Sequence, residues 1–203
     1  LFSEIGGAET SLLYLIEKLD KNKFEPIVIV PNKGYFSERF ENIGIKIIYL
    51  NLPGFFIQEL FIPGMSPKYI LQFLRLCKEL KPNLIHLTNI TQSLYAGVVR
   101  KLLKIPVVAI SWMDSDSIYF YQDFIINFSV DSIITVTPEL KRRILRRGII
   151  EHKKVSVITP GIDAKIFSPS PDKDNAKLKL GIPKQNLVIT IAARFDPVKD
   201  HMT

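Results

Sequence analysis

The chain has 203 residues, of which 47% are hydrophobic, a composition typical of a folded globular protein and not of an intrinsically disordered one. No apolar run reaches the roughly 18 residues of a membrane-spanning helix, and a single cysteine, Cys77, excludes an internal disulfide. The net charge of +7 is concentrated in residues 138–154, where seven basic residues stand against two acidic ones, a local charge of +5.

Strand-like and helix-like patterns alternate along the chain. In order, they predict helix 11–19, strand 26–30, helix 36–43, strand 45–50, helix 67–80, strand 84–87, helix 91–103, strand 107–112, helix 118–128, strand 132–136, a basic helix from Pro138 capped by Thr137, strand 155–158, a weak helix 176–180 and strand 187–192. Residues 51–65 are predicted to form a long, apolar loop.

This alternation predicts an α/β fold, in which a Rossmann-like parallel sheet is flanked by helices and the start of a second α/β domain follows. We expect a first domain over residues 1–158, a hinge over 159–186 and the beginning of the second domain over 187–203. The hinge is placed where the pattern loosens and proline and charged residues accumulate.

Two short motifs at opposite ends of the chain are suited to binding phosphate. Gly6 and Gly7 precede the first predicted helix, where small residues allow positive φ and close approach of an anion to free backbone N–H groups. Arg194 and Lys199 follow the last predicted strand, at the edge where open α/β sheets bind ligands. A guanidinium offers a fork to phosphate oxygens, and an ammonium offers a point charge.

Three stretches, Gly6 to Glu9, Ile158 to Asp163 and Ala193 to Lys199, occur in an order and at spacings that resemble glycosyltransferase family 4. The resemblance implies the N-terminal half of a GT-B fold, with the acceptor-side domain first and its first strand missing. It implies a retaining enzyme that uses a nucleoside-diphosphate sugar. Gly6 and Gly7 would then face the interdomain cleft, and Arg194 and Lys199 would hold the donor diphosphate.

The sequence departs from the family where a histidine often follows the strand that here ends at Trp112. Met113 stands near that place, so Asp114 is a candidate for the cleft, with helix capping by Asp114 and Asp116 as the other interpretation. His86 ends a predicted strand and is a second cleft or acceptor candidate, or else a packed histidine. The scattered histidines and carboxylates show no metal-ligand spacing, so no metal site is expected.

The function expected from the resemblance is transfer of a hexose-type sugar to a glycan or lipid-linked acceptor, with no cofactor besides the sugar donor. The fragment alone is expected to be inactive, and no catalytic base is identified. The protein is expected in the cytoplasm, in cell envelope polysaccharide biosynthesis, without nucleic acid as a partner.

The basic segment 138–154 is either a peripheral membrane contact or a solvated helix face. A non-catalytic nucleotide or sugar-phosphate binding domain and a nucleotide-sugar epimerase of the same fold remain as alternatives.

Overall fold

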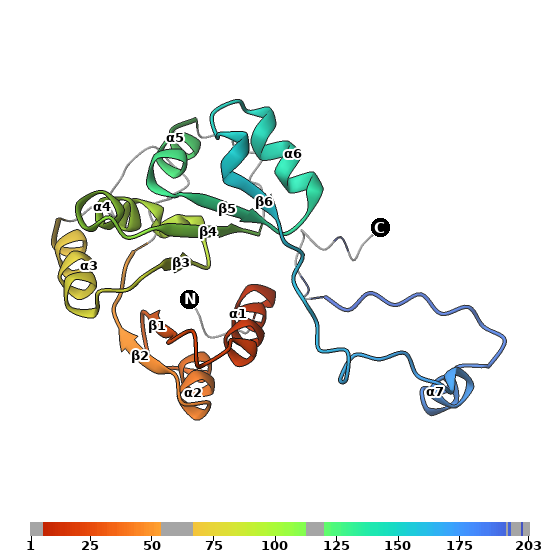
Figure 1. Ribbon diagram of the computed structural model, residues 1–203. Coiled ribbons are helices and arrows are strands. Elements are labelled where there is room, and N and C mark those ends of the chain that lie inside the picture. Colours follow the sequence, from red (N-terminus) through yellow and green to blue (C-terminus); the bar gives the residue numbers. More distant parts are fainter. Residues whose placement is uncertain (1–5, 54–66, 113–119, 194, 196–199, 201–203) are drawn as a thin grey trace. The chain divides into compact units, whose positions relative to one another are not determined.

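The computed structural model describes residues 6–53, 67–112, 120–193, 195 and 200 (Figure 1). The chain divides into two compact units, Leu1–Ile162 and Asp163–Thr203. The helices and strands of the first unit are, in order, α1 Gly7–Lys18, β1 Ile27–Val30, α2 Tyr35–Asn42, β2 Lys46–Tyr49, α3 Pro67–Leu80, β3 Ile85–Leu87, the 3-10 turn η1 Ile90–Gln92, α4 Ser93–Leu103, β4 Val107–Ser111, α5 Phe120–Ser129, β5 Ser132–Thr135, α6 Pro138–Arg146, the 3-10 turn η2 His152–Lys154 and β6 Val155–Val157. Helix α7, Lys173–Lys179, lies in the second unit.

All strand pairs in the described part of the chain are parallel, so the predicted α/β class is confirmed. Strands β3, β4, β5 and β6 form one sheet in that order, with Ile85 opposite Val107 and Ile133 opposite Val155. Strands β1 and β2 form a second sheet. The strands therefore form two sheets and not the single one expected, because no backbone pairing among the described residues joins β1 to β3.

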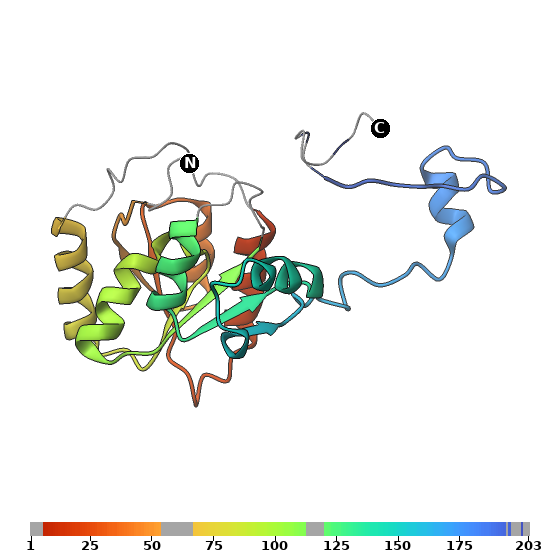
Figure 2. The same cartoon turned by 90° about the horizontal axis from the view of Figure 1, so that it is seen from above.

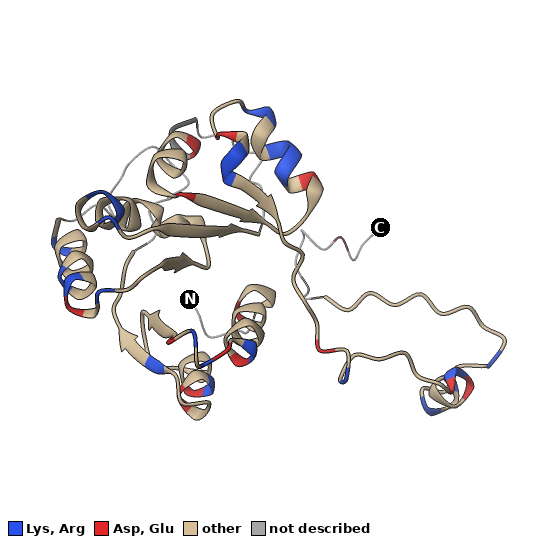
Figure 3. Cartoon of the chain, in the orientation of Figure 1, with Lys and Arg blue, Asp and Glu red and all other residues tan. Residues whose placement is uncertain are grey.

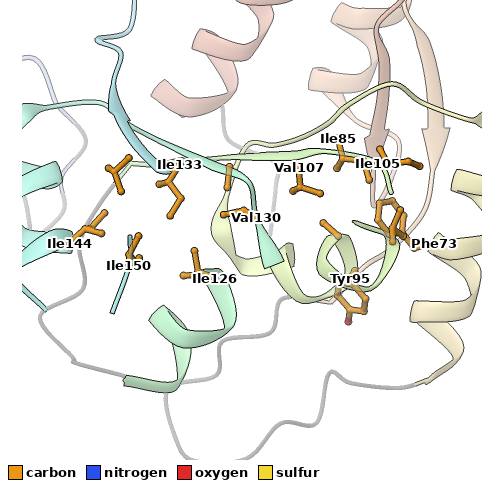
Figure 4. Close-up of a cluster of buried hydrophobic side chains, with 14 of the residues drawn as sticks. Phe73, Ile85, Tyr95, Ile105, Val107, Ile126, Val130, Ile133, Ile144 and Ile150 are labelled. Atoms are coloured by element: carbon orange, nitrogen blue, oxygen red, sulfur yellow. The ribbon is translucent and has the colours of Figure 1, made fainter. Parts of the chain in front are cut away.

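The main core lies between the four-stranded sheet and helices α3 to α6, which cover the same face of that sheet (Figures 1 and 2). Its buried side chains include Val107 and Ala109, which alternate with less buried neighbours along β4. This alternation is expected of a strand with one well-covered face. Figure 4 shows this cluster, in which Val107 and Ile133 come from the sheet and Ile126 comes from α5.

A smaller core joins α1 and α2 to the two-stranded sheet. Leu13 and Ile16 of α1, Val28 of β1 and the fully buried Phe40 of α2 form its centre. The ring of Phe36 meets that of Phe40 edge-on at a centroid distance of 4.6 Å, the geometry that aromatic quadrupoles favour. Ile29 of β1 packs against the main core, whereas Val28 belongs to the smaller one, so β1 contributes side chains to both cores.

Local signals in the sequence explain several helix ends. Thr137 caps α6 by accepting a hydrogen bond at Oγ1 from the Leu140 N–H at 3.1 Å, and Pro138 occupies the first helical position, as predicted. The predicted helix 91–103 instead begins as a 3-10 turn, because Asn89 Oδ1 accepts from the Thr91 N–H at 3.1 Å. Gly44 ends α2 with φ of 77°, a conformation that favours glycine.

One predicted element is wrong. Residues 187–192 were expected to form a strand, but the structure describes them without strand pairing. Leu187 and Ile189 are 89% and 86% exposed. A β-branched run becomes a strand only when a neighbour accepts and donates its backbone hydrogen bonds, and no described segment does so here.

Candidate functional site

The candidate site is the edge of the sheets where the parallel strands end. Helices α4, α5 and α6 each follow a strand of the four-stranded sheet and return toward the start of the next one. Their N-terminal ends therefore lie at this carboxyl edge, together with the residues that follow each strand. Helix termini supply free N–H groups there, which is why open α/β folds bind anionic ligands at this edge.

Gly6 and Gly7 form the start of α1, four residues earlier than the sequence pattern indicated. Gly6 is the N-cap and makes no side-chain capping bond, so the first N–H groups of α1 receive no side-chain acceptor from the cap. A Cβ atom added to Gly7 would meet nothing within 4 Å among the described residues. The open backbone at this helix start is what an approaching phosphate requires.

Gly6 does not need the left-handed backbone that the sequence analysis allowed for, because its φ is −96°. An added Cβ would lie 2.5 Å from Oε2 of Glu9, a contact that this flexible side chain could relieve by rotating. The carboxylate of Glu9 therefore lies over the cap position. An anion that binds the helix start must displace this flexible side chain, or bind beside it.

His86 lies in the middle of β3, and its Nε2 is buried without a hydrogen-bond partner among the described residues. Burial lowers the pKa of its imidazole below the ordinary value of 6.5, because the charged form loses hydration. The side chain is therefore neutral at physiological pH. The assignment of His86 to the cleft stays a prediction, as does its interpretation as a packed histidine.

A polar link across the carboxyl edge was missed by the sequence analysis. Trp112, which directly follows β4, donates a hydrogen bond from Nε1 to the Thr88 carbonyl after β3, at 2.8 Å. This bond fixes the exits of two neighbouring strands relative to each other. The available signal was the chain's single tryptophan, standing where a strand ends, since a partly buried indole N–H usually finds an acceptor.

Four of the residues proposed from the sequence lie outside the described residues. They are the two cations of the last motif and the two carboxylates after β4, namely Arg194, Lys199, Asp114 and Asp116. Their assignments to the donor diphosphate and to the cleft therefore stay predictions.

The basic segment 138–154 lies on the surface over α6 and the turn that follows it (Figure 3). Most of its cations are paired. Glu139 binds Arg142 at 2.6 Å and Arg143 at 3.3 Å, and Glu151 binds Lys153 at 2.9 Å and Lys154 at 3.5 Å. The exposed charge is therefore less concentrated than the sequence implied.

Arg147 differs from the other cations of this segment because it is bound inward. It forms a two-pronged ion pair with Asp123 of α5, in which the NH2 group lies 3.0 Å from Oδ1. The side chain of Asp123 is only 7% exposed. Arg147 thus joins α5 to the end of α6 and is not available to a surface ligand.

A family comparison agrees with this geometry. The model of glycosyltransferase family 4 matches residues 5–166, which include both cores, the Gly6-Gly7 helix start and every strand of the described chain. The chain belongs to this family. The match ends close to the boundary between the two compact units.

The chain is also similar to curated proteins that are named as glycosyltransferases. EpsF of Bacillus subtilis (strain 168), which is named as a glycosyltransferase, is 23% identical over 97% of this chain and 53% of its own length. D-inositol 3-phosphate glycosyltransferase of Streptomyces avermitilis is 31% identical over 35% of this chain and 15% of its own length. The chain thus spans about half the length of the relative that matches it throughout.

Solved structures confirm the GT-B fold. Anabaena HepE in complex with UDP has a TM-score of 0.66 at 15% identity, over 88% of this chain and 48% of that one. A glycosyltransferase from Rickettsia africae has a TM-score of 0.59 at 16% identity, over 87% of this chain and 45% of that one. At these identities the likeness establishes the fold alone. This chain covers about half the length of each of these solved chains.

Proposed function

We propose that the complete protein transfers a sugar from a nucleoside-diphosphate sugar to a glycan or lipid-linked acceptor, with retention of the anomeric configuration. The observation that carries this proposal is the family 4 match over residues 5–166, which includes a helix start at Gly6-Gly7 without a side-chain cap. Anabaena HepE, which shares the fold, has been solved with UDP-glucose, and this supports a nucleotide-sugar donor. A hexose is the sugar class we propose.

The chemistry assigned to this chain is stabilisation of a leaving group. When the bond between the anomeric carbon and the diphosphate breaks, negative charge grows on the diphosphate. Fixed cations and helix N–H groups lower the barrier if they bind that charge more strongly than the ground state. Arg194 and Lys199 are the proposed cations, and the start of α1 at Gly6-Gly7 is the proposed N–H donor.

The two cations are tested by Arg194→Ala and Lys199→Ala in the complete protein. Each substitution should cost about 2–4 kcal/mol of transition-state stabilisation, a loss of roughly 30- to 1,000-fold in kcat/KM, as removal of a fixed donor does. Lys173→Ala is the matched control, since it removes an exposed cation of the same unit. Wild-type rates in both test variants would contradict the diphosphate assignment.

We also propose that the reaction needs no metal or other cofactor, because the cations and helix N–H groups named above can neutralise the leaving diphosphate. Transfer should then be unchanged after dialysis against EDTA. A loss of activity in EDTA that Mg²⁺ or Mn²⁺ restores would contradict this part of the proposal. The measurement is the rate of sugar transfer before and after chelation.

We propose last that residues 138–154 make a peripheral contact with the inner face of the cell membrane. The protein would act there in cell envelope polysaccharide synthesis. Among the described residues, no helix combines the length and the apolar character needed to cross a bilayer. Arg146 and Lys141 of α6 have no carboxylate partner in that part of the chain and could attract anionic lipid. A glycan acceptor would not require this contact, whereas a lipid-linked acceptor would.

The matching experiment is sedimentation with vesicles that contain anionic lipid. Replacing Arg142, Arg143 and Arg146 with Gln should weaken binding, and binding should fade as salt rises, because screening is strong at physiological ionic strength. Arg147 is left unchanged, since it holds Asp123. Equal binding to anionic and neutral vesicles, or no binding to either kind, would show that α6 presents an ordinary solvated helix face.

A further inference from the structure

Helix α5 exposes two aromatic side chains to solvent and buries its charged residue. Its inward side carries Asp123, Ile126 and Ser129, which are 5%, 3% and 3% exposed. Its outward side carries Phe124 and Phe128, one helical turn apart, which are 60% and 54% exposed. A surface helix normally has the opposite arrangement, with charge facing water and aromatic rings facing the core.

The outward side of α5 also lacks charge. Asp123 is the one charged residue among the ten of the helix, and it is buried against Arg147. Phe124 and Phe128 therefore form an aromatic ridge that is not broken by a solvated ionic group of the same helix. Exposed aromatic pairs of this kind mark interaction sites more often than isolated apolar residues do.

Cations stand on both sides of this aromatic ridge. On the α4 side, Nζ of Lys101 lies 3.4 Å from the centroid of the Phe128 ring, a cation–π contact. On the α6 side, Lys154 donates to the Asn127 carbonyl and Lys153 is 82% exposed. Glu151 pairs with both of these lysines, at 2.9 Å and 3.5 Å, and Lys154 is only 14% exposed. Two lysines against one carboxylate leave a net positive charge there, and Lys153 is the exposed cation of the pair. Asp131 is bound by Arg100 at 2.6 Å.

We infer that the aromatic ridge Phe124–Phe128 inserts into the interfacial region of an anionic bilayer, with Lys101 and Lys153 at the level of the headgroups. Aromatic side chains between lysines that extend toward headgroups are the pattern of helices that lie in a membrane surface. This inference rests on the proposed membrane contact and gives it an apolar component, which α6 lacks. Charge complementarity selects a lipid surface over a second copy of this chain, whose identical basic flanks would repel.

The experiment measures partition of the full-length protein onto vesicles of phosphatidylcholine with or without phosphatidylglycerol. Phe124→Ser with Phe128→Ser should weaken partition onto the anionic vesicles by roughly tenfold per residue, because each ring loses its transfer out of water. That loss should persist at high salt, whereas the loss caused by the Gln substitutions in α6 should not. Leu71→Ser with Leu84→Ser is the matched control, since those side chains are 50% and 51% exposed on other segments.

A second readout covers the case in which the double variant does not fold. Phe124→Trp should show fluorescence quenching by brominated lipid beyond that of the wild-type protein measured in parallel, in which Trp112 is the one tryptophan of residues 1–203. Unchanged partition of a folded Ser variant, or no added quenching, would overturn the inference while leaving the α6 contact.

A wild-type dimer that the Ser variant dissociates would overturn it in favour of a second copy. Absence of any vesicle binding would overturn both membrane statements, and nucleotide-sugar transfer to a soluble acceptor would still test the enzymatic proposal separately.

Discussion

Gly97 shows what a single residue contributes to the helix layer. A Cβ atom at this position of α4 would lie 2.7 Å from Cβ and 3.0 Å from the backbone Cα of Ser129 in α5. Such separations are shorter than real side chains tolerate, and a backbone atom cannot rotate away. The absence of a side chain at Gly97 therefore sets how closely α4 and α5 approach.

Gly97→Ala should destabilise the fold for this reason. Overpacking of a tight contact costs about 1–3 kcal/mol, against a gain of roughly 1 kcal/mol from the higher helix propensity of alanine. Chemical denaturation should show a net loss. Gly161→Ala serves as control, because an added Cβ there meets nothing within 4 Å. Equal stability of the two variants would mean that α4 and α5 are not in close contact.

His86 makes a prediction about pH. Its pKa is lowered by burial, so between that value and the unfolded value of about 6.5 the unfolded chain binds more protons than the folded one. Stability should therefore fall as pH decreases below about 6.5. His86→Leu should reduce this fall, and the free energy of unfolding measured at pH 7 and pH 5 for both proteins checks it. Parallel pH profiles would show that His86 is accessible and hydrated.

At the scale of elements, the ion pair between Asp123 and Arg147 joins α5 to α6. Arg147→Ala would leave the Asp123 carboxylate buried without its partner, a change that typically costs about 3–5 kcal/mol. Arg142→Ala is the matched control: it also breaks an ion pair in the same segment, but at the surface, where such pairs are worth about 0–1 kcal/mol. The comparison is made by thermal or urea denaturation. Similar losses in the two variants would contradict the anchoring role of Arg147.

The same two helices show how far the sequence could predict an element. Helix α6 was predicted with its cap because Thr137 and Pro138 are local signals, read without knowledge of the fold. The inward binding of Arg147 could not be predicted, since it depends on Asp123, 24 residues earlier in the chain. In the same way, the sequence pattern predicted helix α5 but could not predict which of its faces is buried. Local structure follows from near neighbours, whereas burial follows from segments distant in the sequence.

At the scale of the whole molecule, the parallel α/β class followed from the alternation of strands and helices and is confirmed. The separation into two sheets was not predictable, because pairing of β1 with any neighbour is a property of the assembled sheet. The strand expected at 187–192 is wrong for the same reason: its apolar residues are exposed and have no described neighbour. Of the proposed site, the structure describes the helix start at Gly6-Gly7 and His86, and the cations of the last motif stay predictions.

The proposed glycosyltransferase activity is tested most directly by product analysis with the complete protein and a panel of nucleoside-diphosphate sugars, in the presence and absence of glycan and lipid-linked acceptors. A retaining glycosyltransferase should give acceptor-dependent release of nucleoside diphosphate, matched by a new glycosidic bond with the donor's anomeric configuration. Arg194→Ala and Lys199→Ala should suppress this release. Conversion of the donor sugar into its epimer without any acceptor, or tight donor binding with no turnover on any acceptor, would contradict the proposed activity.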